Sequence, residues 1–349
     1  MKKMALLMTL VMAVSLAGCG GNSKKTESKD TDGKGAKTEF SASMVCDTGG
    51  INDQSFNQSS WEGLQEFAES EGAKVNYLES TQASDFATNF DKLSDEDLNL
   101  IWGIGYNVAD ALKNSAEMNP DKTYAIVDYD FGEETPDNVV CTTFNVQYSS
   151  FLVGYIAGLM TETDHIGYIG GMKSPTMDLF EYGYRAGAGY AAKELNKEIT
   201  VDVQYAESFT DSAKGKAMAK SMYSSGCDIL FHAAGGVGVG AIEEAAEEGK
   251  WIIGVDRDQS YLAPENILTS ALKVTGVATK EISKKIKDGE DIAGQSFAYG
   301  LKEGAVGIPS ENPNLADGVY DKTMEVQKLI EAGEITPPST EEEFNQFGK

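Results

Sequence analysis

Short apolar runs alternate with amphipathic stretches along most of the chain, from about residue 39 to residue 300. Some runs are apolar throughout, such as Trp251–Val255, which is typical of a strand covered on both faces in a parallel sheet. Between such runs apolar residues recur at helical spacing, as Trp61, Leu64 and Phe67 do. The pattern predicts strands at Phe40–Cys46, Lys74–Leu78, Leu98–Ile104, Tyr124–Asp128, His165–Ile169, Thr200–Gln204, Asp228–Ala233, Trp251–Asp256, Asn266–Leu272 and Gln295–Tyr299.

Strands that alternate with helices imply parallel sheets joined by right-handed crossovers. A body of roughly 310 residues exceeds the usual size of one core, and the apolar helical stretch Phe151–Met160 starts a second series of strands. We therefore predict an α/β fold of two doubly wound lobes. Lobe 1 takes residues 39–144, with about 274–294 returning to it, and lobe 2 takes residues 145–273. Residues 295–349 form a C-terminal segment that completes the lobes and ends in an acidic tail.

The N-terminus has the layout of an export signal. Two lysines precede an apolar run from Met4 to Leu16, and the motif Leu-Ala-Gly-Cys ends at Cys19. The run is shorter than the roughly 20 residues that a membrane-spanning helix needs. Residues 1–18 therefore look like a bacterial lipoprotein signal peptide, cut before Cys19, whose thiol is acylated. Several acyl chains suffice for stable anchoring, so we expect an extracytoplasmic protein anchored to the cell membrane through lipid.

The next segment, residues 19–38, consists of small and charged residues with almost no apolar side chains. Such a segment cannot bury enough surface to fold, and it predicts a flexible tether between lipid and body. Without the signal peptide the chain has 27 basic and 55 acidic residues, a net charge of 27 − 55 = −28. Proteins that bind nucleic acid carry a basic surface, so the charge excludes nucleic acid as a partner.

Few residues suit metal binding or catalysis. Beyond the N-terminal region three cysteines remain, at Cys46, Cys141 and Cys227, an odd number at long spacings. This predicts neither a disulfide framework nor a zinc site, and we expect small buried side chains. The two histidines, His165 and His232, lie far apart in sequence. No nucleophile elbow or zinc-protease motif occurs, so we expect no enzyme activity, no cofactor and no metal.

Ligands bind beyond the carboxyl ends of strands in open α/β sheets. The residues at or just after predicted strand ends are Asp47, Phe56, Asn57, Asp128, Phe231, His232, Gly235, Asp256 and Lys273. Together they offer aromatic faces for a flat base and carboxylates that accept hydrogen bonds from a vicinal diol such as a ribose. Each has a plainer interpretation, because an aspartate at a strand end is often a helix cap or a turn residue. Phe56 and Phe231 could belong to the core, and His232 could be a loop histidine.

A run of motifs resembles a known family. Asp47-Thr48-Gly49-Gly50 with Asp53, followed by Ser55-Phe56-Asn57-Gln58 and Trp61-Glu62-Gly63, is similar to the opening of the basic membrane protein family. These are lipoproteins of the purine nucleoside receptor type that serve ABC importers. Further matches are Gly154-Tyr155-Ile156-Ala157-Gly158, Ile166-Gly167-Tyr168-Ile169-Gly170-Gly171-Met172, Gly183-Tyr184-Arg185-Ala186-Gly187, Ala234-Gly235-Gly236-Val237-Gly238, Gly254-Val255-Asp256 and Ile267-Leu268-Thr269-Ser270.

The resemblance implies a type I periplasmic-binding-protein fold, with a ligand cleft between two hinged lobes. It also implies a purine nucleoside such as adenosine, guanosine or inosine in the cleft, with ABC permease and ATPase subunits as partners. In the family an aromatic pair holds the base, and aspartates and a lysine hold the ribose. The residues that carry over are Asp47, Phe56, Asn57, Asp128, Asp256 and Lys273. The second base-stacking residue stays open among Phe231, His232, Tyr106 and Phe180.

Three alternatives remain. The first is a binding protein of the same fold for another small solute, a sugar or a related compound. The second is an NAD-dependent oxidoreductase, because Gly236-Val237-Gly238-Val239-Gly240-Ala241 precedes Asp256, which lies 20 residues after Gly236. The export signal disfavours it, since soluble NAD is scarce outside the cell. The third is a signalling ectodomain, disfavoured because a lipid cannot transmit a conformational change across a bilayer. Nothing in the sequence requires more than a monomer.

Overall fold

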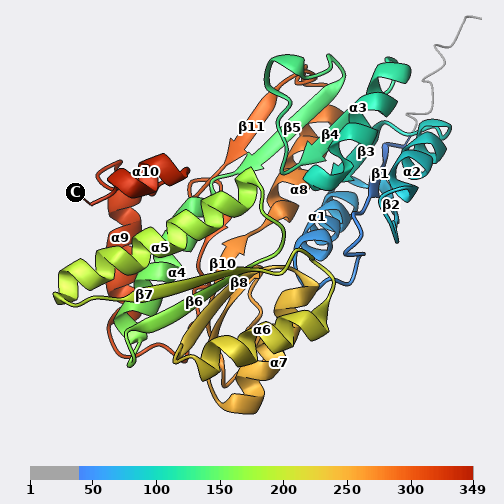
Figure 1. Cartoon of the computed structure of the whole chain (residues 1–349). Coiled ribbons are helices and arrows are strands. Elements are labelled where there is room, and N and C mark those ends of the chain that lie inside the picture. The colour runs from blue at the N-terminus through green and yellow to red at the C-terminus, as the bar shows by residue number, and fades with distance from the viewer. Residues whose placement is uncertain (1–38, 349) are drawn as a thin grey trace, which may run out of the picture. The chain divides into compact units, whose positions relative to one another are not determined.

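A computed structural model describes residues 39–348, which fold as one compact unit. The predicted signal peptide, the tether and the lipidated Cys19 lie outside these residues. Within them the chain forms two six-stranded sheets (Figure 1). The α/β prediction with two doubly wound sheets is therefore confirmed.

The first sheet has the strand order β11-β5-β4-β3-β1-β2, and all its strands are parallel. Its strands are β1 (Ser41–Val45), β2 (Lys74–Leu78), β3 (Leu100–Ile104), β4 (Tyr124–Val127), β5 (Val139–Phe144) and β11 (Ser296–Tyr299). Strand β11 comes from the C-terminal part of the chain, so the chain returns to this sheet after forming five strands of the second one and before forming its sixth, β12.

The second sheet has the order β12-β10-β9-β8-β6-β7 and is parallel except for β12, which runs antiparallel to β10. Its strands are β6 (His165–Gly170), β7 (Thr200–Tyr205), β8 (Ile229–Ala233), β9 (Trp251–Asp256), β10 (Ile267–Lys273) and β12 (Val306–Gly307). The two orders follow the same pattern, so each strand of one sheet has a counterpart in the other. Strand β4 corresponds to β9, and β1 corresponds to β6.

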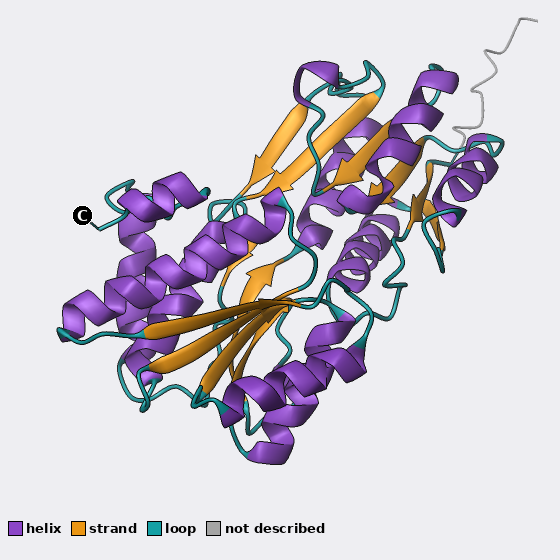
Figure 2. Cartoon of the chain, viewed as in Figure 1, coloured by secondary structure: helices purple, strands orange, loops and turns teal. Residues whose placement is uncertain are grey.

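Helices flank both faces of each sheet, as Figure 2 shows. They are α1 (Phe56–Glu71), α2 (Asp85–Ser94), α3 (Ala109–Met118), α4 (Val146–Met160), α5 (Pro175–Leu195), α6 (Ser212–Ser224), α7 (Gly236–Glu248), α8 (Thr275–Lys287), α9 (Val319–Glu331) and α10 (Glu341–Gln346), with 3-10 turns at Tyr106–Val108, Gly132–Glu134 and Ser260–Leu262. In the first sheet Trp102 packs with α1 and α8, whereas its neighbour Ile101 packs with α2 and α3. In the second sheet Phe231 shares a cluster with α4 and α5, and Leu230 with α6 and α7. Successive strand residues point to opposite faces, so burial on both faces explains the unbroken apolar runs.

Every strand that the apolar pattern predicts is present, with ends that differ by two residues or fewer. Two strands were missed. Strand β5 contains Thr142 and Thr143, which interrupt its apolar run, and it follows a polar segment with a 3-10 turn at Gly132–Glu134. Strand β12 is two residues long and too short to give a pattern. All three cysteines of the body are buried and free, as expected.

Candidate functional site

A cavity lies where the carboxyl ends of the strands of both sheets meet. Its lining comes from loops and helix starts that are far apart in sequence. The lining residues are Asp47, Gly49, Asp53, Phe56, Asn57, Gly105, Tyr106, Asn107, Asp128, Met177, Phe180, Phe209, Ala233, Ala234, Gly235, Val255, Asp256 and Lys273. Pockets that bind small molecules are lined in this way, mostly by apolar and aromatic side chains with a few polar groups among them.

The structure brings most of the predicted site residues together in this cavity. Asp47, Phe56, Asn57, Tyr106, Asp128, Phe180, Gly235, Asp256 and Lys273 all line it. Two predicted residues, Phe231 and His232, do not. Both lie inside strand β8, directly before the lining residues Ala233, Ala234 and Gly235. The strand continues past these two side chains, so each is enclosed by helices before the cavity begins.

The phenylalanine of this pair belongs to the core of the second sheet. The ring of Phe231 lies with its centroid 5.6 Å from Tyr168, 5.1 Å from Tyr184 and 6.2 Å from Phe180. The histidine points to the opposite face, where Gly238 of α7 packs directly on its imidazole. Complete burial lowers the pKa of His232 to about 4, so the ring is neutral at physiological pH.

The loop between β1 and α1 is held by a network of side chains. Nδ2 of Asn57 donates to Oδ1 of Asp47 at 2.8 Å and to Oδ2 of Asp53 at 3.0 Å. The Asp53 carboxylate also accepts from the backbone N–H groups of Ser55, Asn57 and Gln58, at 3.0, 2.7 and 3.1 Å. It thus satisfies the free donors at the start of α1. The network fixes Phe56, the first residue of α1, beside the cavity.

Burial raises the pKa of Asp47, although hydrogen bonds from Asn57 and Gly49 act in the opposite direction. The backbone N–H of Gly49 donates to Oδ1 of Asp47 at 2.9 Å. Asp47 therefore enters the cavity as a desolvated carboxylate whose first oxygen already has two donors. Its remaining acceptor capacity is available to a ligand.

Two aspartates end corresponding strands of the two sheets with an unusual backbone. Asp128 directly follows β4 and Asp256 is the last residue of β9, with φ angles of 66° and 64°. Positive φ is costly for residues with a side chain, and aspartate tolerates it better than most. Residues held in this way concentrate at functional sites. In both sheets the left-handed residue turns the chain sharply and directs a carboxylate to the cavity.

The two carboxylates have different partners. Asp128 forms a buried ion pair with Nζ of Lys273, the last residue of β10. The lysine ammonium also lies 4.6 Å from the ring centroid of Phe56 and 5.8 Å from that of Phe180. Asp256 instead accepts a hydrogen bond from the hydroxyl of Ser55. Burial raises the pKa of Asp256 to about 6, against the lowering influence of Lys273 and Ser55.

Aromatic side chains supply the apolar part of the lining. Phe56 begins α1 beside the first sheet, Phe180 lies in α5 beside the second, and Phe209 lies in the loop after β7. Tyr106 meets Phe209 edge to face, with centroids 6.5 Å apart. The hydroxyl of Tyr106 is buried and has no hydrogen-bond partner among residues 39–348. The cavity thus combines flat apolar surfaces with polar atoms that remain free to bind.

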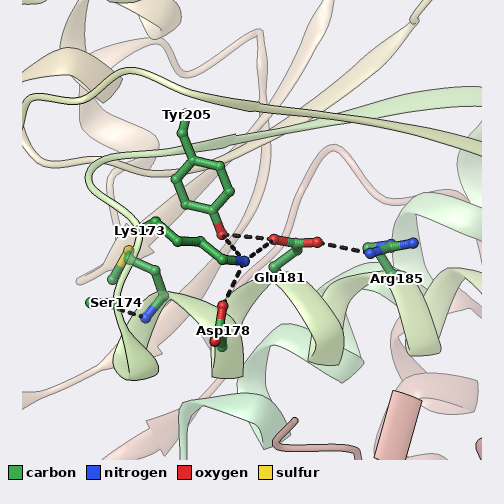
Figure 3. A network of polar contacts seen from close by, with 7 residues as sticks. Lys173, Ser174, Asp178, Glu181, Arg185 and Tyr205 are labelled. Carbon is green, nitrogen blue, oxygen red and sulfur yellow. Dashed lines mark hydrogen bonds and ion pairs between the residues drawn. The ribbon is translucent and has the colours of Figure 1, made fainter. Parts of the chain in front are cut away.

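A polar network holds the start of α5, which contributes Met177 and Phe180 to the lining (Figure 3). Nζ of Lys173 lies 2.6 Å from Oδ1 of Asp178 and 2.9 Å from Oε2 of Glu181. Glu181 also accepts from the Tyr205 hydroxyl at 2.7 Å and from Nη1 of Arg185 at 2.8 Å. The buried Glu181 thus joins α5, the loop after β6 and the end of β7.

Several residues that line the cavity were not predicted from the sequence. Gly105 and Asn107 follow directly after β3, so the rule of strand ends could have found them. Phe209 lies four residues beyond the edge strand β7, and Met177 lies in the first turn of α5. Neither has a local pattern that distinguishes it from a core residue. Phe209 adds a further candidate to the open question of the second stacking residue.

The glycine-rich start of α7 is used for packing. A methyl group at Gly238 would overlap the imidazole of His232, and one at Gly240 would overlap the backbone oxygen of Ser212 in α6. The N–H of Gly236 donates to the carbonyl of Phe209 at 2.8 Å. These glycines allow α7 to lie close to its neighbours, which accounts for the motif without a dinucleotide.

Among residues 39–348, none of the helices is both long enough and apolar enough to span a bilayer.

Over residues 40–341 the chain matches the Bmp family, described as PnrA-like ABC transporter substrate-binding proteins. It is 38% identical over 363 residues to the ABC transporter nucleoside-binding protein BmpA of Lactococcus lactis subsp. cremoris, an alignment that covers 97% of this chain and 100% of that protein.

Two solved structures locate the fold. An ABC transporter solute-binding protein from Aeropyrum pernix K1 superposes with a TM-score of 0.78 at 25% identity, covering 88% of this chain and 96% of that one. The operator-bound lac repressor dimer superposes with a TM-score of 0.55 at 13% identity, covering 80% of this chain and 96% of that one. The second likeness concerns the fold alone. Together they confirm the expected type I periplasmic-binding-protein fold.

Proposed function

Because the chain belongs to the family of PnrA-like ABC transporter substrate-binding proteins, we propose that it captures a purine nucleoside in the cavity between its two sheets. A substrate-binding protein acts by binding and not by catalysis, so the chain is not an enzyme. Its partners are a small-molecule ligand and the permease and ATPase subunits of an ABC transporter. The proposal concerns the identity of the ligand and the residues that hold it.

One observation carries this proposal: aromatic faces and carboxylates line the same cavity. Phe56 and Phe209 offer ring surfaces on which a flat base can stack. Asp128 and Asp256 offer oxygens that accept hydrogen bonds from the two hydroxyls of a ribose. A ligand that uses both features has a flat ring joined to a polyol, which is the chemistry of a nucleoside.

The charge of the lining favours a neutral ligand over a phosphorylated one. Four carboxylates, from Asp47, Asp53, Asp128 and Asp256, face one ammonium, from Lys273. That ammonium is already paired with Asp128. A phosphate would be repelled by the remaining carboxylates and would have to displace this ion pair. We therefore expect the protein to take nucleosides and to reject nucleotides.

Capture depends on contacts from both sides of the cavity. Ser55 of the first sheet's loop reaches Asp256 of the second sheet, and Lys273 of the second reaches Asp128 of the first. A ligand that bridges the two sides stabilises the arrangement in which the lobes are closed around it. The closed form is then the form that the permease receives.

Isothermal titration calorimetry with adenosine, adenine, ribose, adenosine monophosphate and glucose tests the proposal. We expect adenosine to bind tightest, with adenine and ribose each weaker by more than about tenfold, since each lacks one set of contacts. Equal binding of ribose and adenosine, or preference for glucose, would show that the ligand is a sugar instead. Tighter binding of the monophosphate would contradict the charge argument. Thermal shift with NAD serves as the check on a dinucleotide ligand.

We also propose that Cys19 is lipidated and holds the protein at the extracytoplasmic face of the membrane. The motif that ends at this cysteine supports the proposal. The Cys19→Ser variant should move from the membrane fraction to the soluble fraction, while Cys141→Ser, a buried cysteine of the body, should not. Retention of the Cys19 variant in the membrane fraction would contradict lipid anchoring.

A further inference from the structure

Three side chains with metal-binding chemistry meet at the edge of the second sheet, away from the cavity. They are His165 at the start of β6, Asp202 within β7 and Cys227, which lies just before β8. One ligand atom from each lies within 4.8 Å of the other two. None of the three lines the cavity, which is built at the opposite, carboxyl ends of these strands. We propose that this cluster, the His165 site, binds a transition-metal ion, and that Zn²⁺ suits it best.

The fold brings the three residues together although they are distant in sequence. In the pairing of β6 with β7, Asp202 is the register partner of Gly167. It is therefore diagonal to His165 on the same face of the sheet. The N–H of Asp228 donates to the carbonyl of His165 at 3.1 Å, which holds the segment with Cys227 against β6. The spacing in the sequence does not indicate a metal site, because the three residues come from β6, β7 and the segment before β8, which are far apart along the chain.

The distances between the donor atoms are close to those of a zinc site. Nε2 of His165 lies 3.0 Å from Oδ2 of Asp202, and Sγ of Cys227 lies 3.9 Å from the same oxygen. With zinc bonds of about 2.0–2.3 Å, neighbouring ligand atoms of a tetrahedron are about 3.3–3.6 Å apart. The two distances differ from this range by about 0.3 Å each, and the third pair of donor atoms lies within 4.8 Å. Nε2 of His165 is buried and makes no hydrogen bond within the described part of the chain, and its near neighbour is the Asp202 carboxylate, which would be a ligand of the same ion.

The donor set selects the metal. An imidazole nitrogen, a carboxylate oxygen and a thiolate sulfur are the ligands that Zn²⁺ uses in proteins, and three protein ligands leave a fourth position for water. Mg²⁺ and Ca²⁺ prefer oxygen ligands alone and should bind poorly. The nearby Asp228 is not a further ligand, because its carboxylate accepts from the Thr161 hydroxyl at 2.8 Å and from the N–H groups of Glu162 and Thr163 at 2.7 and 3.0 Å.

Metal binding at this site releases a proton. A free cysteine is mostly a thiol at neutral pH, whereas the form that binds a metal is the thiolate. On binding, the S–H bond breaks, the sulfur donates its electron pair to the metal, and the proton passes to solvent. The bound ion would tie β6, β7 and the segment before β8 to one another and so stabilise the folded state.

Titration of Zn²⁺ into the full chain tests the proposal. The protein carries Cys19→Ser, has no histidine tag, and is treated with a chelator before the titration. We expect one equivalent to bind, with release of a proton into a weakly buffered solution and a rise in melting temperature. Co²⁺ in place of Zn²⁺ should give a thiolate-to-cobalt charge-transfer absorption band. Calcium and magnesium at the same concentration should give neither effect.

Variants of the three ligands provide the controls. Cys227→Ser should remove the cobalt band and weaken zinc affinity by more than about 100-fold, because even changes behind a metal ligand cost 10–100-fold. His165→Gln and Asp202→Asn should weaken it too, so the test does not depend on one variant being folded. Cys141→Ser, a buried cysteine of the first sheet, should leave zinc affinity unchanged. No zinc binding by the parent chain, or full binding by Cys227→Ser, overturns the proposal.

Discussion

The ends of β4 and β9 occupy corresponding places in the two sheets, and comparison of them shows how one cavity is built from two similar halves. Both strands carry an aspartate in the left-handed conformation, Asp128 in the first sheet and Asp256 in the second. Each aspartate reaches across to a residue of the other half, Lys273 or Ser55. The backbone geometry is thus repeated, while the partner is different.

The difference in partner separates two roles. Lys273 neutralises Asp128, and the pair is buried among the rings of Phe56, Phe144 and Phe180. Asp256 has no ion pair and accepts a hydrogen bond from the Ser55 hydroxyl, and burial raises its pKa to about 6 although Lys273 and Ser55 lower it. The first carboxylate, besides facing the cavity, holds the two halves in place through Lys273, whereas the second has no ion pair and keeps more of its acceptor capacity for a ligand. Substitution of Asp128 should therefore mainly reduce stability, whereas substitution of Asp256 should mainly reduce ligand affinity.

The largest effect is expected for stability, at Asp128. Asp128→Ala leaves the Lys273 ammonium buried without a partner, and we expect the free energy of unfolding to fall by about 3–5 kcal/mol. The double variant Asp128→Leu with Lys273→Met removes both charges and should recover most of this loss. Urea unfolding followed by circular dichroism measures both. Equal stability of the Asp128→Ala variant and the parent would show that the pair is not a structural link.

Affinity should respond most strongly at Asp256. Asp256→Ala removes an acceptor of charge-assisted hydrogen bonds worth about 1.5–3 kcal/mol, so nucleoside affinity should fall by well over tenfold. The same change relieves a poorly compensated buried charge, so the free energy of unfolding of the ligand-free protein should not fall in proportion. Calorimetry of this variant beside Asp317→Ala, an exposed aspartate, separates the site from the surface. Unchanged affinity would remove Asp256 from the site.

The dependence of nucleoside affinity on pH should also come mainly from Asp256 of the second sheet. The pKa of Asp256 is raised to about 6 from an ordinary 3.8, and hydroxyl donors of a ligand need the carboxylate. Nucleoside affinity should therefore fall as the pH drops through about 6, by about tenfold between pH 7 and pH 5. Without ligand the sign is opposite: the contribution of this group to stability is greatest below about pH 4 and is lost as the pH rises to about 6.

The variant Asp256→Asn isolates this pH effect. It should flatten most of the dependence of affinity on pH, leaving the part that belongs to Asp47, whose pKa is also raised by burial. Calorimetric titrations of the parent and the variant at pH 5, 6 and 7 make the comparison. A parent protein whose affinity does not change over this range would contradict the assignment of a buried, poorly paired carboxylate.

The smallest effect is expected at an exposed contact between the halves. The hydroxyl of Tyr261 donates to Oε1 of Gln54 at 2.6 Å, and Tyr261 is half exposed. Water can replace an exposed bond of this kind, so Tyr261→Phe should weaken ligand affinity by less than about threefold. Tyr320→Phe, in α9, provides the matched control. A loss above tenfold would mean that closure depends on this contact as much as on the buried pairs.

The apolar pattern of the sequence predicted the strands and the residues at their ends. It did not predict backbone conformations or which side chains reach the cavity. Asp128 and Asp256 were found because each ends an apolar run, and ligands bind beyond the carboxyl ends of such strands. The left-handed conformation of both residues could not be read from the pattern, since aspartate at a strand end fits several turn geometries. Phe231 was chosen for its place near a strand end, but that strand runs on beneath helices before it reaches the cavity.

Contacts between distant residues were beyond the reach of the pattern. Ser55 and Asp256 are 201 residues apart, and Lys273 and Asp128 are 145 apart. The second sheet shows the same limit at its other edge, where His165, Asp202 and Cys227 converge although each looked isolated in sequence. Phe209 illustrates it again, because a single aromatic residue in a polar loop has no periodicity from which to infer a role.

The proposed nucleoside binding is tested most directly by identifying the small molecule that co-purifies with the protein. Protein purified without added ligand is denatured, and mass spectrometry identifies and quantifies whatever is released. We expect a purine nucleoside from the parent chain, and much less of it from Asp256→Ala. A sugar, a peptide or a phosphorylated compound bound at one equivalent, in an amount that Asp256→Ala leaves unchanged, would contradict it.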